Sequence, residues 1–263
     1  PSRRTGDLRL HLRDWSIAVD YDFRAGKKRV EDILDGCMEV LEQDRLPSID
    51  NLTFTNAYES CVTAIFVDIR DSTTLMDDDD QEYVAKVVRS FTSEIIEILH
   101  SYHDSIEREI GIRGDCVYGV YTTPYREDVY NIFQLAVWVN TYLNMLNALL
   151  RKRGYDPIAA GIGVASSKDH AIKAGRKNKS VNAVVWMGEA VSTAANLSDY
   201  GDGEIDDRIV ISELTYRNIR DQYEAEYPGN DWFKTSPKLP DGAKHCSIVK
   251  KKNEQVDKKR YAR

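Results

Sequence analysis

The feature that most constrains this chain is an apolar stretch at residues 61–67 that ends on an acidic residue, Asp68. Apolar and β-branched residues alternate along it, which favours a buried strand. Ser72, Thr73 and Thr74 follow closely and favour a turn or a helix start. Because ligands often gather beyond the carboxyl ends of strands, Asp68 is a candidate metal ligand. Taken alone, an Asp in this place is better explained as the cap of a turn.

A second stretch, residues 106–121, carries the pair Gly114-Asp115 between two runs of alternating polar and apolar residues. This pattern predicts a β-hairpin with a tight turn. If the hairpin lies beside the first strand, Asp68 and Asp115 can meet over one or two divalent cations. Magnesium suits such a site, because proteins bind it through few carboxylates together with substrate phosphates. Asp115 alone is better explained as a turn residue.

Charge and cysteine content exclude some classes of protein. The formal net charge of the 263 residues is −7, which argues against a nucleic-acid binder because such proteins normally carry a basic surface. The four cysteines show no CxxC spacing, so we expect buried free thiols in a reducing cytoplasm and no zinc site. No apolar run approaches the ~20 residues that a membrane span needs, and a signal-peptide core is missing. We therefore expect a soluble cytoplasmic protein without a membrane partner.

Helical periodicity recurs in three long segments, at residues 29–43, 81–103 and 127–153. The first predicts an amphipathic helix whose apolar face packs on the core or on a second copy of the chain. Four acids at 77–80 precede the second segment, where the helix dipole favours them. A cation site is the alternative for these acids. Further strands are predicted at 158–164, 182–186 and 208–212, and helices at 188–200 and from residue 213.

This order of elements predicts an α+β fold. An antiparallel-centred sheet with flanking helices on one face, in a ferredoxin-like arrangement, accommodates it. We assign residues 56–250 to one catalytic domain, which is long enough to bury a sizeable core. Residues 1–55 form an N-terminal extension with the amphipathic helix, and residues 251–263 form a basic tail.

Three motifs, in this order, resemble those of the class III nucleotidyl cyclases. Residues 66–73, "FVDIRDST", are similar to the family's first metal motif, and residues 112–120, "IRGDCVYGV", to its second. Residues 185–197 resemble the family's glycine-led helix. Order and spacing agree over roughly residues 60–220. The resemblance implies the class III cyclase fold, with two active sites at the interface of a head-to-tail homodimer.

The resemblance also implies roles for individual residues. Asp68, Asp115 and the carbonyl group of Ile69 would hold two Mg²⁺ or Mn²⁺ ions per active site. The loop with Arg70, Ser72 and Thr73 would bind phosphate oxygens of a nucleoside triphosphate. The 3′-hydroxyl of the substrate would attack its own α-phosphorus and release pyrophosphate, leaving a 3′,5′-cyclic nucleotide.

The chain departs from the family at the positions that contact the base. Purine cyclases of this class usually place a Lys four residues before the hairpin Asp and a polar residue three before the helix glycine. Gly111 and Val185 occupy these positions here. A site built to hydrogen-bond adenine does not work with such residues, so ATP is a poor first candidate for the substrate.

A further departure concerns catalysis. Ser192 and Asn196 occupy the helix positions that usually carry a ribose-orienting Asn and a phosphate-stabilising Arg. Both are polar and could still contact the ribose or a phosphate. Arg113, two residues before Asp115, is our first candidate for the missing positive charge; Arg70 or a basic residue of the loop at 168–179 could supply it instead. A salt bridge is the alternative role of Arg113.

Retained metal ligands with altered base contacts resemble one branch of the family, the pyrimidine cyclases of bacterial Pycsar antiphage systems. We therefore expect conversion of UTP to cyclic UMP, a second messenger for a separate effector protein. Tyr58, near the start of the first strand, would narrow the nucleotide pocket to one ring; an ordinary core tyrosine is the alternative. Other possibilities are a cytidylate or purine cyclase, or a cyclase-like regulatory module that binds nucleotide without turnover.

Overall fold

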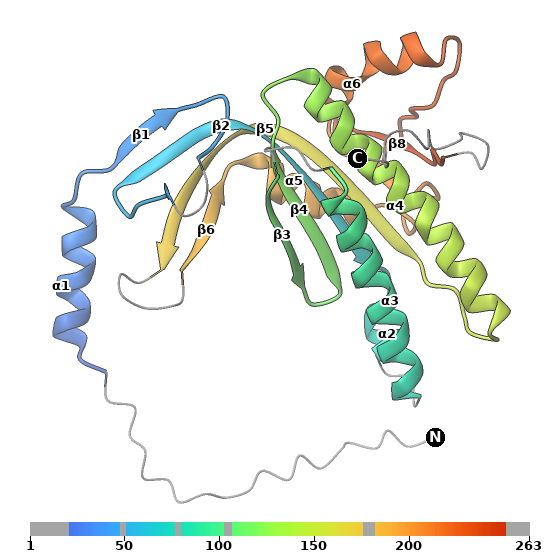
Figure 1. Ribbon diagram of the computed structural model, residues 1–263, viewed down its shortest axis with the longest axis horizontal. Coiled ribbons are helices and arrows are strands. Elements are labelled where there is room, and N and C mark those ends of the chain that lie inside the picture. The colour runs from blue at the N-terminus through green and yellow to red at the C-terminus, as the bar shows by residue number, and fades with distance from the viewer. Residues whose placement is uncertain (1–20, 48–50, 77–79, 103–106, 176–181, 251–263) are drawn as a thin grey trace, which may run out of the picture. The chain divides into compact units, whose positions relative to one another are not determined.

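The computed structural model describes residues 21–47, 51–76, 80–102, 107–175 and 182–250 (Figure 1). The chain divides into two units, residues 1–38 and residues 39–263. The first unit contains helix α1 (Phe23–Leu34), whose start is capped by the side chain of Asp22 accepting from the backbone N–H of Ala25. The second unit contains the sheet and all the predicted site residues.

The prediction of one helix over residues 29–43 is wrong in its bounds. Helix α1 starts earlier and ends at Leu34. Residues Glu39–Glu42 form a strand, β1, that runs parallel to the start of β2 (Asn56–Ile69). Pairing with a strand distant in sequence has overridden the helical spacing. The predicted domain boundary at 55/56 therefore separates β1 from its partner strand.

One mixed sheet of eight strands forms the second unit, with the order β3-β4-β2-β5-β7-β8; β1 adds to β2, and β6 adds to β5. Strand β2 is central and runs antiparallel to β4 (Cys116–Thr122) and β5 (Ala160–Gly175). The antiparallel centre of the sheet is as predicted. The remaining strands are β3 (Glu107–Arg113), β6 (Asn182–Met187), β7 (Ile209–Ile211) and β8 (Lys244–Cys246).

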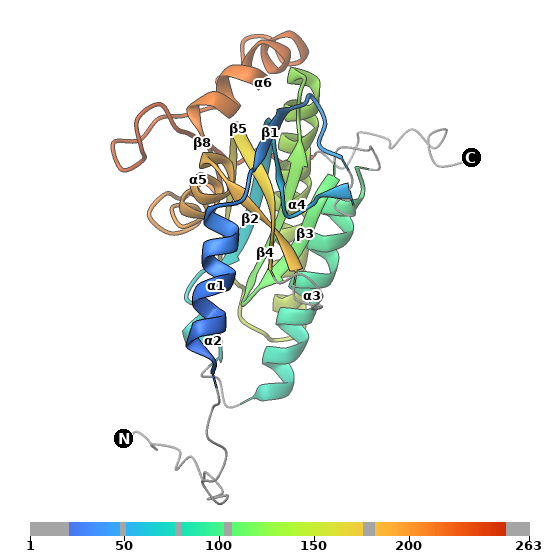
Figure 2. The same cartoon turned by 90° about the vertical axis from the view of Figure 1, so that its left-hand side faces the viewer.

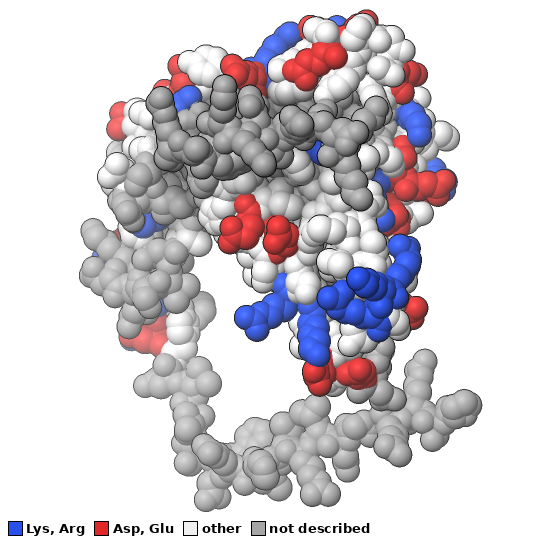
Figure 3. All heavy atoms as spheres, turned by 45° about the vertical axis from the view of Figure 1, so that its right-hand side comes forward, with Lys and Arg blue, Asp and Glu red and all other residues white. Residues whose placement is uncertain are grey.

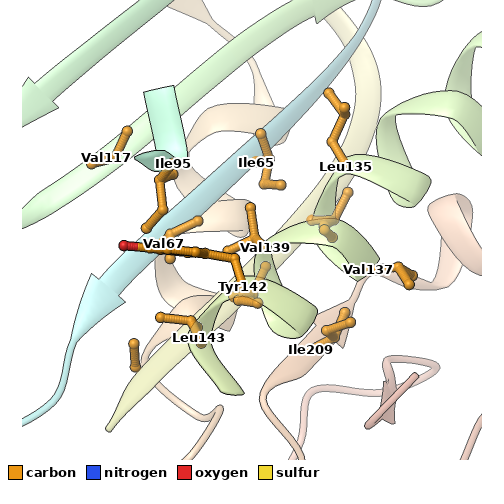
Figure 4. Close-up of a cluster of buried hydrophobic side chains, with 14 of the residues drawn as sticks. Ile65, Val67, Ile95, Val117, Leu135, Val137, Val139, Tyr142, Leu143 and Ile209 are labelled. Atoms are coloured by element: carbon orange, nitrogen blue, oxygen red, sulfur yellow. The ribbon is translucent and has the colours of Figure 1, made fainter. Parts of the chain in front are cut away.

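The main core lies between the sheet and helices α3 (Gln81–His100), α4 (Arg126–Lys152) and α6 (Glu213–Glu226). Residues Ile65, Phe91 and Phe133 are fully buried in it. Figure 4 shows Ile65 and Val67 of β2 among side chains of α3, α4 and β7. The predicted bounds of α3 and α4 agree with the structure to within three residues. Within the described ranges, no helix has the length and apolar character that crossing a membrane requires.

Helix α5 (Glu189–Ser198) corrects the prediction that all helices cover one face. Its residues Ala190, Ala194 and Leu197 pack on Val62 and Ala64, on the other side of the sheet from α3 and α4. Figure 1 shows α5 behind the sheet and the two long helices in front of it, and in Figure 2 they lie on opposite sides of the sheet. The small residues of α5 explain this close second layer.

The structure also bears on the predictions for the acidic run at 77–80 and for the cysteines. Asp80 caps α3 by accepting from the backbone N–H of Tyr83, which supports a helix-start role for this acid; Asp77–Asp79 lie outside the described residues. The expectation of buried thiols holds for Cys246, but Cys37 and Cys61 are exposed.

Glycine at position 163 allows α5 to contact β5. A β-carbon at Gly163 would lie 1.9 Å from the carbonyl oxygen of Ala194. We therefore expect Gly163→Ala to destabilise the fold by about 2 kcal/mol, because such overpacking forces the backbone to move. A thermal melt should show a fall of about 4–8 °C. Gly203→Ala is the matched control, since its nearest atom would be 3.6 Å away. Equal melting temperatures for the two variants would contradict this account of α5 packing.

Candidate active site

Asp68 lies on the face of the sheet that α5 covers. Side chains alternate along a strand, so Asp68 shares this face with Ala64 and Phe66, while Ile65 and Val67 point into the main core. Two positions on neighbouring strands pair with Asp68, namely Cys116 on β4 and Gly161 on β5.

Two rows of paired residues cross this face. The carboxylate row contains Arg113, Cys116 and Asp68. The aromatic row contains Gly111, Tyr118 and Phe66 and lies two residues, or about 6.8 Å, further along the strands.

The β3–β4 hairpin places Asp115 next to the carboxylate row. Gly114 and Asp115 form its two-residue loop, as predicted, and Gly114 has a φ of +66°, a left-handed conformation that glycine adopts without strain. Asp115 precedes Cys116, the direct partner of Asp68. The two carboxylates are close enough that Asp115 raises the pKa of Asp68.

Asp68 is held by Arg70. The guanidinium group donates to the carboxylate of Asp68 over 2.6 Å and to the backbone carbonyl of Asp199, just after α5, over 3.0 Å. Burial raises the pKa of the Asp68 carboxyl, Asp115 raises it further, and Arg70 lowers it; the net pKa lies above the ordinary value. The positive charge of Arg70 therefore compensates the ionised carboxylate of Asp68 only in part.

This electrostatic deficit fits a divalent cation. Asp68 and Asp115 would supply two hard oxygen ligands, and the carbonyl group of Ile69, at the end of β2, would supply a third. Burial raises the pKa of the neighbouring Cys116 thiol to about 12, so this thiol is protonated in the metal-free protein. Among the described residues, no group of three His, Cys, Asp or Glu side chains forms a complete metal cage. Substrate oxygens would have to complete the coordination.

The aromatic row was not predicted as part of the site. The rings of Phe66 and Tyr118 stack with centroids 5.2 Å apart and planes 15° apart. The Tyr118 ring lies over Gly111, where a β-carbon would meet it at 2.6–2.8 Å. The side chain of Tyr118 thus fills the space above the position at which we expected a base-contacting residue. The sequence feature that could have indicated this contact is the pairing of Gly111 with Tyr118 across the predicted hairpin.

Glu109 continues this face beyond the aromatic row. It accepts from the hydroxyl group of Tyr118 over 2.5 Å and from the indole N–H of Trp186 over 2.9 Å. Burial raises the pKa of Tyr118 to about 12, with a contribution from Glu109, so the hydroxyl stays protonated. Trp186 is the neighbour of Val185, whose side chain points to the opposite side of β6.

Most of the other predicted residues lie around the carboxylate row. Arg113 belongs to the row, is exposed, and has its guanidinium 6.0 Å from the centroid of the Tyr118 ring. Ser72 and Thr73 begin the short helix α2 (Ser72–Met76), directly after β2 and Arg70.

Two predicted residues lie on α5, the helix that covers the same face of the sheet as Asp68. Ser192 and Asn196 are exposed on α5, one helical turn from each other. Within the described part of the chain, neither side chain forms a hydrogen bond with Asp68, Asp115 or Arg70.

The structure places Tyr58 in a small core, which was the alternative to a role in the nucleotide pocket. This residue lies ten positions before Asp68 on β2, up to about 34 Å along the strand. It is 8% exposed and packs with Leu46, Leu52 and Ala171 in a separate small core. Trp186 packs against this core and also against the core under α5. The pocket role of Tyr58 stays a prediction, whereas Tyr118 lies one row of paired residues from Asp68.

A groove of about 570 Å³ lies elsewhere, between α3 and α4. Its walls carry Lys86, Arg89 and Arg153, and Figure 3 shows basic side chains gathered at one end of this surface. The groove is on the face of the sheet opposite to Asp68, so it is not part of the candidate site.

Repulsion between the two carboxylates leads to a prediction for the metal-free protein. Asp115→Asn should raise the melting temperature by about 2–4 °C, or about 1 kcal/mol, because it removes a charge that disfavours ionised Asp68. The gain should shrink as the pH falls through the raised pKa of Asp68, since a proton then removes the same repulsion.

Addition of Mn²⁺ should make the melting temperature of the wild type higher than that of Asp115→Asn. At about 100 times its Kd, the ion should stabilise the wild type by about 2.7 kcal/mol and leave Asp115→Asn nearly unchanged. Calorimetry of both proteins, with Glu97→Gln on α3 as a control, makes the measurement. Equal stabilisation of wild type and Asp115→Asn by Mn²⁺ would argue against a cation at this site.

Comparison with known proteins gives consistent results. Residues 55–239 match the family model described as the adenylate and guanylate cyclase catalytic domain. A uridylate cyclase from Treponema porcinum is 49% identical over 206 residues, which cover 78% of this chain and 71% of that protein. A uridylate cyclase from Gulbenkiania mobilis is 33% identical over 185 residues, covering 67% of this chain and 70% of that protein.

A solved structure agrees in fold. The adenylyl cyclase CyaB from P. aeruginosa superposes with a TM-score of 0.54 at 21% identity, covering 63% of this chain and 83% of that chain. The family model covers well over half of the sequence, and it includes Asp68, Asp115 and helix α5. This chain belongs to the family of adenylate and guanylate cyclase catalytic domains.

Proposed function

We propose that this chain is a uridylate cyclase that converts UTP to 3′,5′-cyclic UMP and pyrophosphate. The observation that carries the proposal is 49% identity, over most of the chain, to a protein named uridylate cyclase. The paired carboxylates Asp68 and Asp115 support an active enzyme. Gly111, with the Tyr118 ring above it, supports a substrate other than ATP.

The proposed reaction needs two divalent cations, Mg²⁺ or Mn²⁺, held by Asp68, Asp115 and the carbonyl of Ile69. When bound, such ions acidify the attacking 3′-hydroxyl group and stabilise charge on the α-phosphate and on the leaving pyrophosphate. The two side chains are suited to this role because they are partly buried and mutually repulsive, so that they gain from a cation.

Basic and hydroxyl-bearing residues would bind the triphosphate. Arg70 keeps a second bond to Asp199, so it can stay beside the carboxylate row when a cation neutralises Asp68. Ser72 and Thr73 follow it and would offer backbone N–H groups to phosphate oxygens. Arg113 is exposed in the same row and is our candidate for stabilising the transition-state phosphate.

A head-to-tail homodimer would complete each site. Ser192 and Asn196 are exposed on α5 and make no hydrogen bond to the carboxylates of their own described chain. In a two-fold dimer they would instead contact the nucleotide held by the carboxylates of the partner copy.

Two alternatives differ in substrate or in turnover. CTP could replace UTP, since uracil and cytosine differ along one edge. A purine nucleotide could be the substrate if other residues contact the base. A regulatory module that binds nucleotide without turnover is the second alternative, and it is favoured by Ser192 and Asn196 at the positions that usually carry Asn and Arg.

The biological role follows from the resemblance to Pycsar cyclases. Cyclic UMP made in the cytoplasm would serve as a second messenger in antiphage defence. A separate effector chain would bind the product, so no direct contact between enzyme and effector is required.

A nucleotide survey tests the activity. Purified protein with Mn²⁺ and each of ATP, GTP, CTP and UTP should form cyclic UMP as the main product, identified by chromatography with mass detection. Asp68→Ala should lower the rate at least about 100-fold, because phosphate charge is left uncompensated. Asp241→Ala, an exposed acid in the loop before β8, is the matched control. Nucleotide binding without any product would favour the regulatory module.

Complementation tests the shared sites. Asp68→Ala and Asn196→Ala should each be nearly inactive as homodimers, the second by about 10- to 100-fold. Co-expression should form mixed dimers with one intact site, and about a quarter of wild-type activity should return. Mixed dimers that form, as seen by tagged pull-down, but stay inactive would contradict this assignment of Asn196.

A further inference from the structure

We propose that the hydroxyl oxygen of Tyr118 is the group that selects uracil over cytosine, and that Glu109 and Trp186 are positioning residues that fix its hydrogen-bond polarity. This inference rests on the proposed function, which it deepens by naming the contact that distinguishes two pyrimidines. The residues concerned are Tyr118, Glu109, Trp186 and the stacked ring of Phe66.

The location supports a contact with the base. Tyr118 lies in the aromatic row, on the same face as Asp68 and about 6.8 Å along the strand from the carboxylate row. Its ring covers Gly111 and stacks on Phe66, so the wall is apolar and fixed in orientation. A nucleotide whose phosphates lie at the carboxylates would bring its base toward such a wall.

The direction of each hydrogen bond is fixed by chemistry. An indole N–H can only donate, and an ionised carboxylate can only accept. Trp186 therefore donates to Glu109 over 2.9 Å, and the hydroxyl of Tyr118 must donate to Glu109 over 2.5 Å. With its hydrogen committed, the Tyr118 oxygen presents only lone pairs to a ligand.

An acceptor at this position distinguishes the two pyrimidines. Uracil carries a hydrogen on N3 and can donate it to the Tyr118 oxygen. Cytosine carries a lone pair on N3, so the two acceptors would repel, and the base would have to shift by one ring atom to offer its amino group. An unmatched polar contact of this kind is a strong basis for discrimination, because buried groups are left unpaired.

A single substitution should invert the hydrogen-bond polarity of the Tyr118 hydroxyl group, from acceptor to donor toward the ligand. In Glu109→Gln, the amide oxygen is the only acceptor for the indole N–H of Trp186, so the amide NH₂ faces Tyr118. The hydroxyl group must then accept from Gln and turn its hydrogen toward the ligand, where it matches N3 of cytosine.

The experiment measures kcat/KM for UTP and CTP with Mn²⁺ in the wild type and in this variant. We expect Glu109→Gln to lower the UTP to CTP ratio by at least about tenfold. Adding Trp186→Phe to Glu109→Gln frees the amide to rotate, so the ratio should move back toward the wild-type value. Glu97→Gln, an exposed glutamate on α3, should leave the ratio unchanged.

A second variant keeps the test valid if Glu109→Gln does not fold. Tyr118→Phe retains the ring stacked on Phe66 and loses only the hydroxyl group, so it should also lower the UTP to CTP ratio by about tenfold. A ratio within twofold of the wild type in Tyr118→Phe would overturn the inference while leaving the cyclase activity in place. A wild type that forms no cyclic nucleotide from any substrate would instead overturn the proposed function.

Discussion

The pairing of β2 with β4 on one side and β5 on the other is the interaction on which the rest of this structure depends. Strand β2 is antiparallel to both neighbours, and its register fixes which side chains share a face. That register brings Asp68 opposite Cys116, and therefore beside the hairpin loop with Asp115. A shift by one residue would turn every side chain of β2 to the other face and separate the carboxylates from their surroundings. The hydrophobic core and the candidate site are thus specified by the same contact.

The site is electrostatically unfavourable in the absence of a cation. Two partly buried carboxylates lie close together, and Arg70 compensates Asp68 only in part, so the pKa of Asp68 lies above its ordinary value. Such an arrangement lowers the stability of the fold, and proteins retain it where function requires it. Because Arg70 donates to Asp68, a cation bound by Asp68 would share this carboxylate with the guanidinium group, and its binding would then be coupled to the orientation of Arg70.

Much of the fold could be predicted from sequence, because the periodicity of apolar residues is a local property. Helices α3 and α4, the strand ending at Asp68 and the hairpin around Gly114-Asp115 all follow from it. The helix predicted over residues 29–43 failed beyond Leu34, since strand β1 gains its stability from pairing with β2. The placement of α5 on the second face also depends on long-range packing, because a glycine such as Gly163 shows its role only when a helix backbone lies on it.

The sequence by itself determined the chemistry of the carboxylates: two aspartates, each at the end of a strand pattern, predicted a cation site and the cyclase resemblance. Only the tertiary structure decided which residues surround that site. The sequence gives no reason to prefer Tyr118 over Tyr58 as a residue near the carboxylates. In the structure, Tyr58 packs in a small core, whereas Tyr118 stacks on Phe66, one row of paired residues from Asp68. Glu109 and Trp186 are 77 positions apart and meet through a hydrogen bond. The physical reason is that ligand identity is carried by residue type, whereas proximity is set by strand register and sheet order.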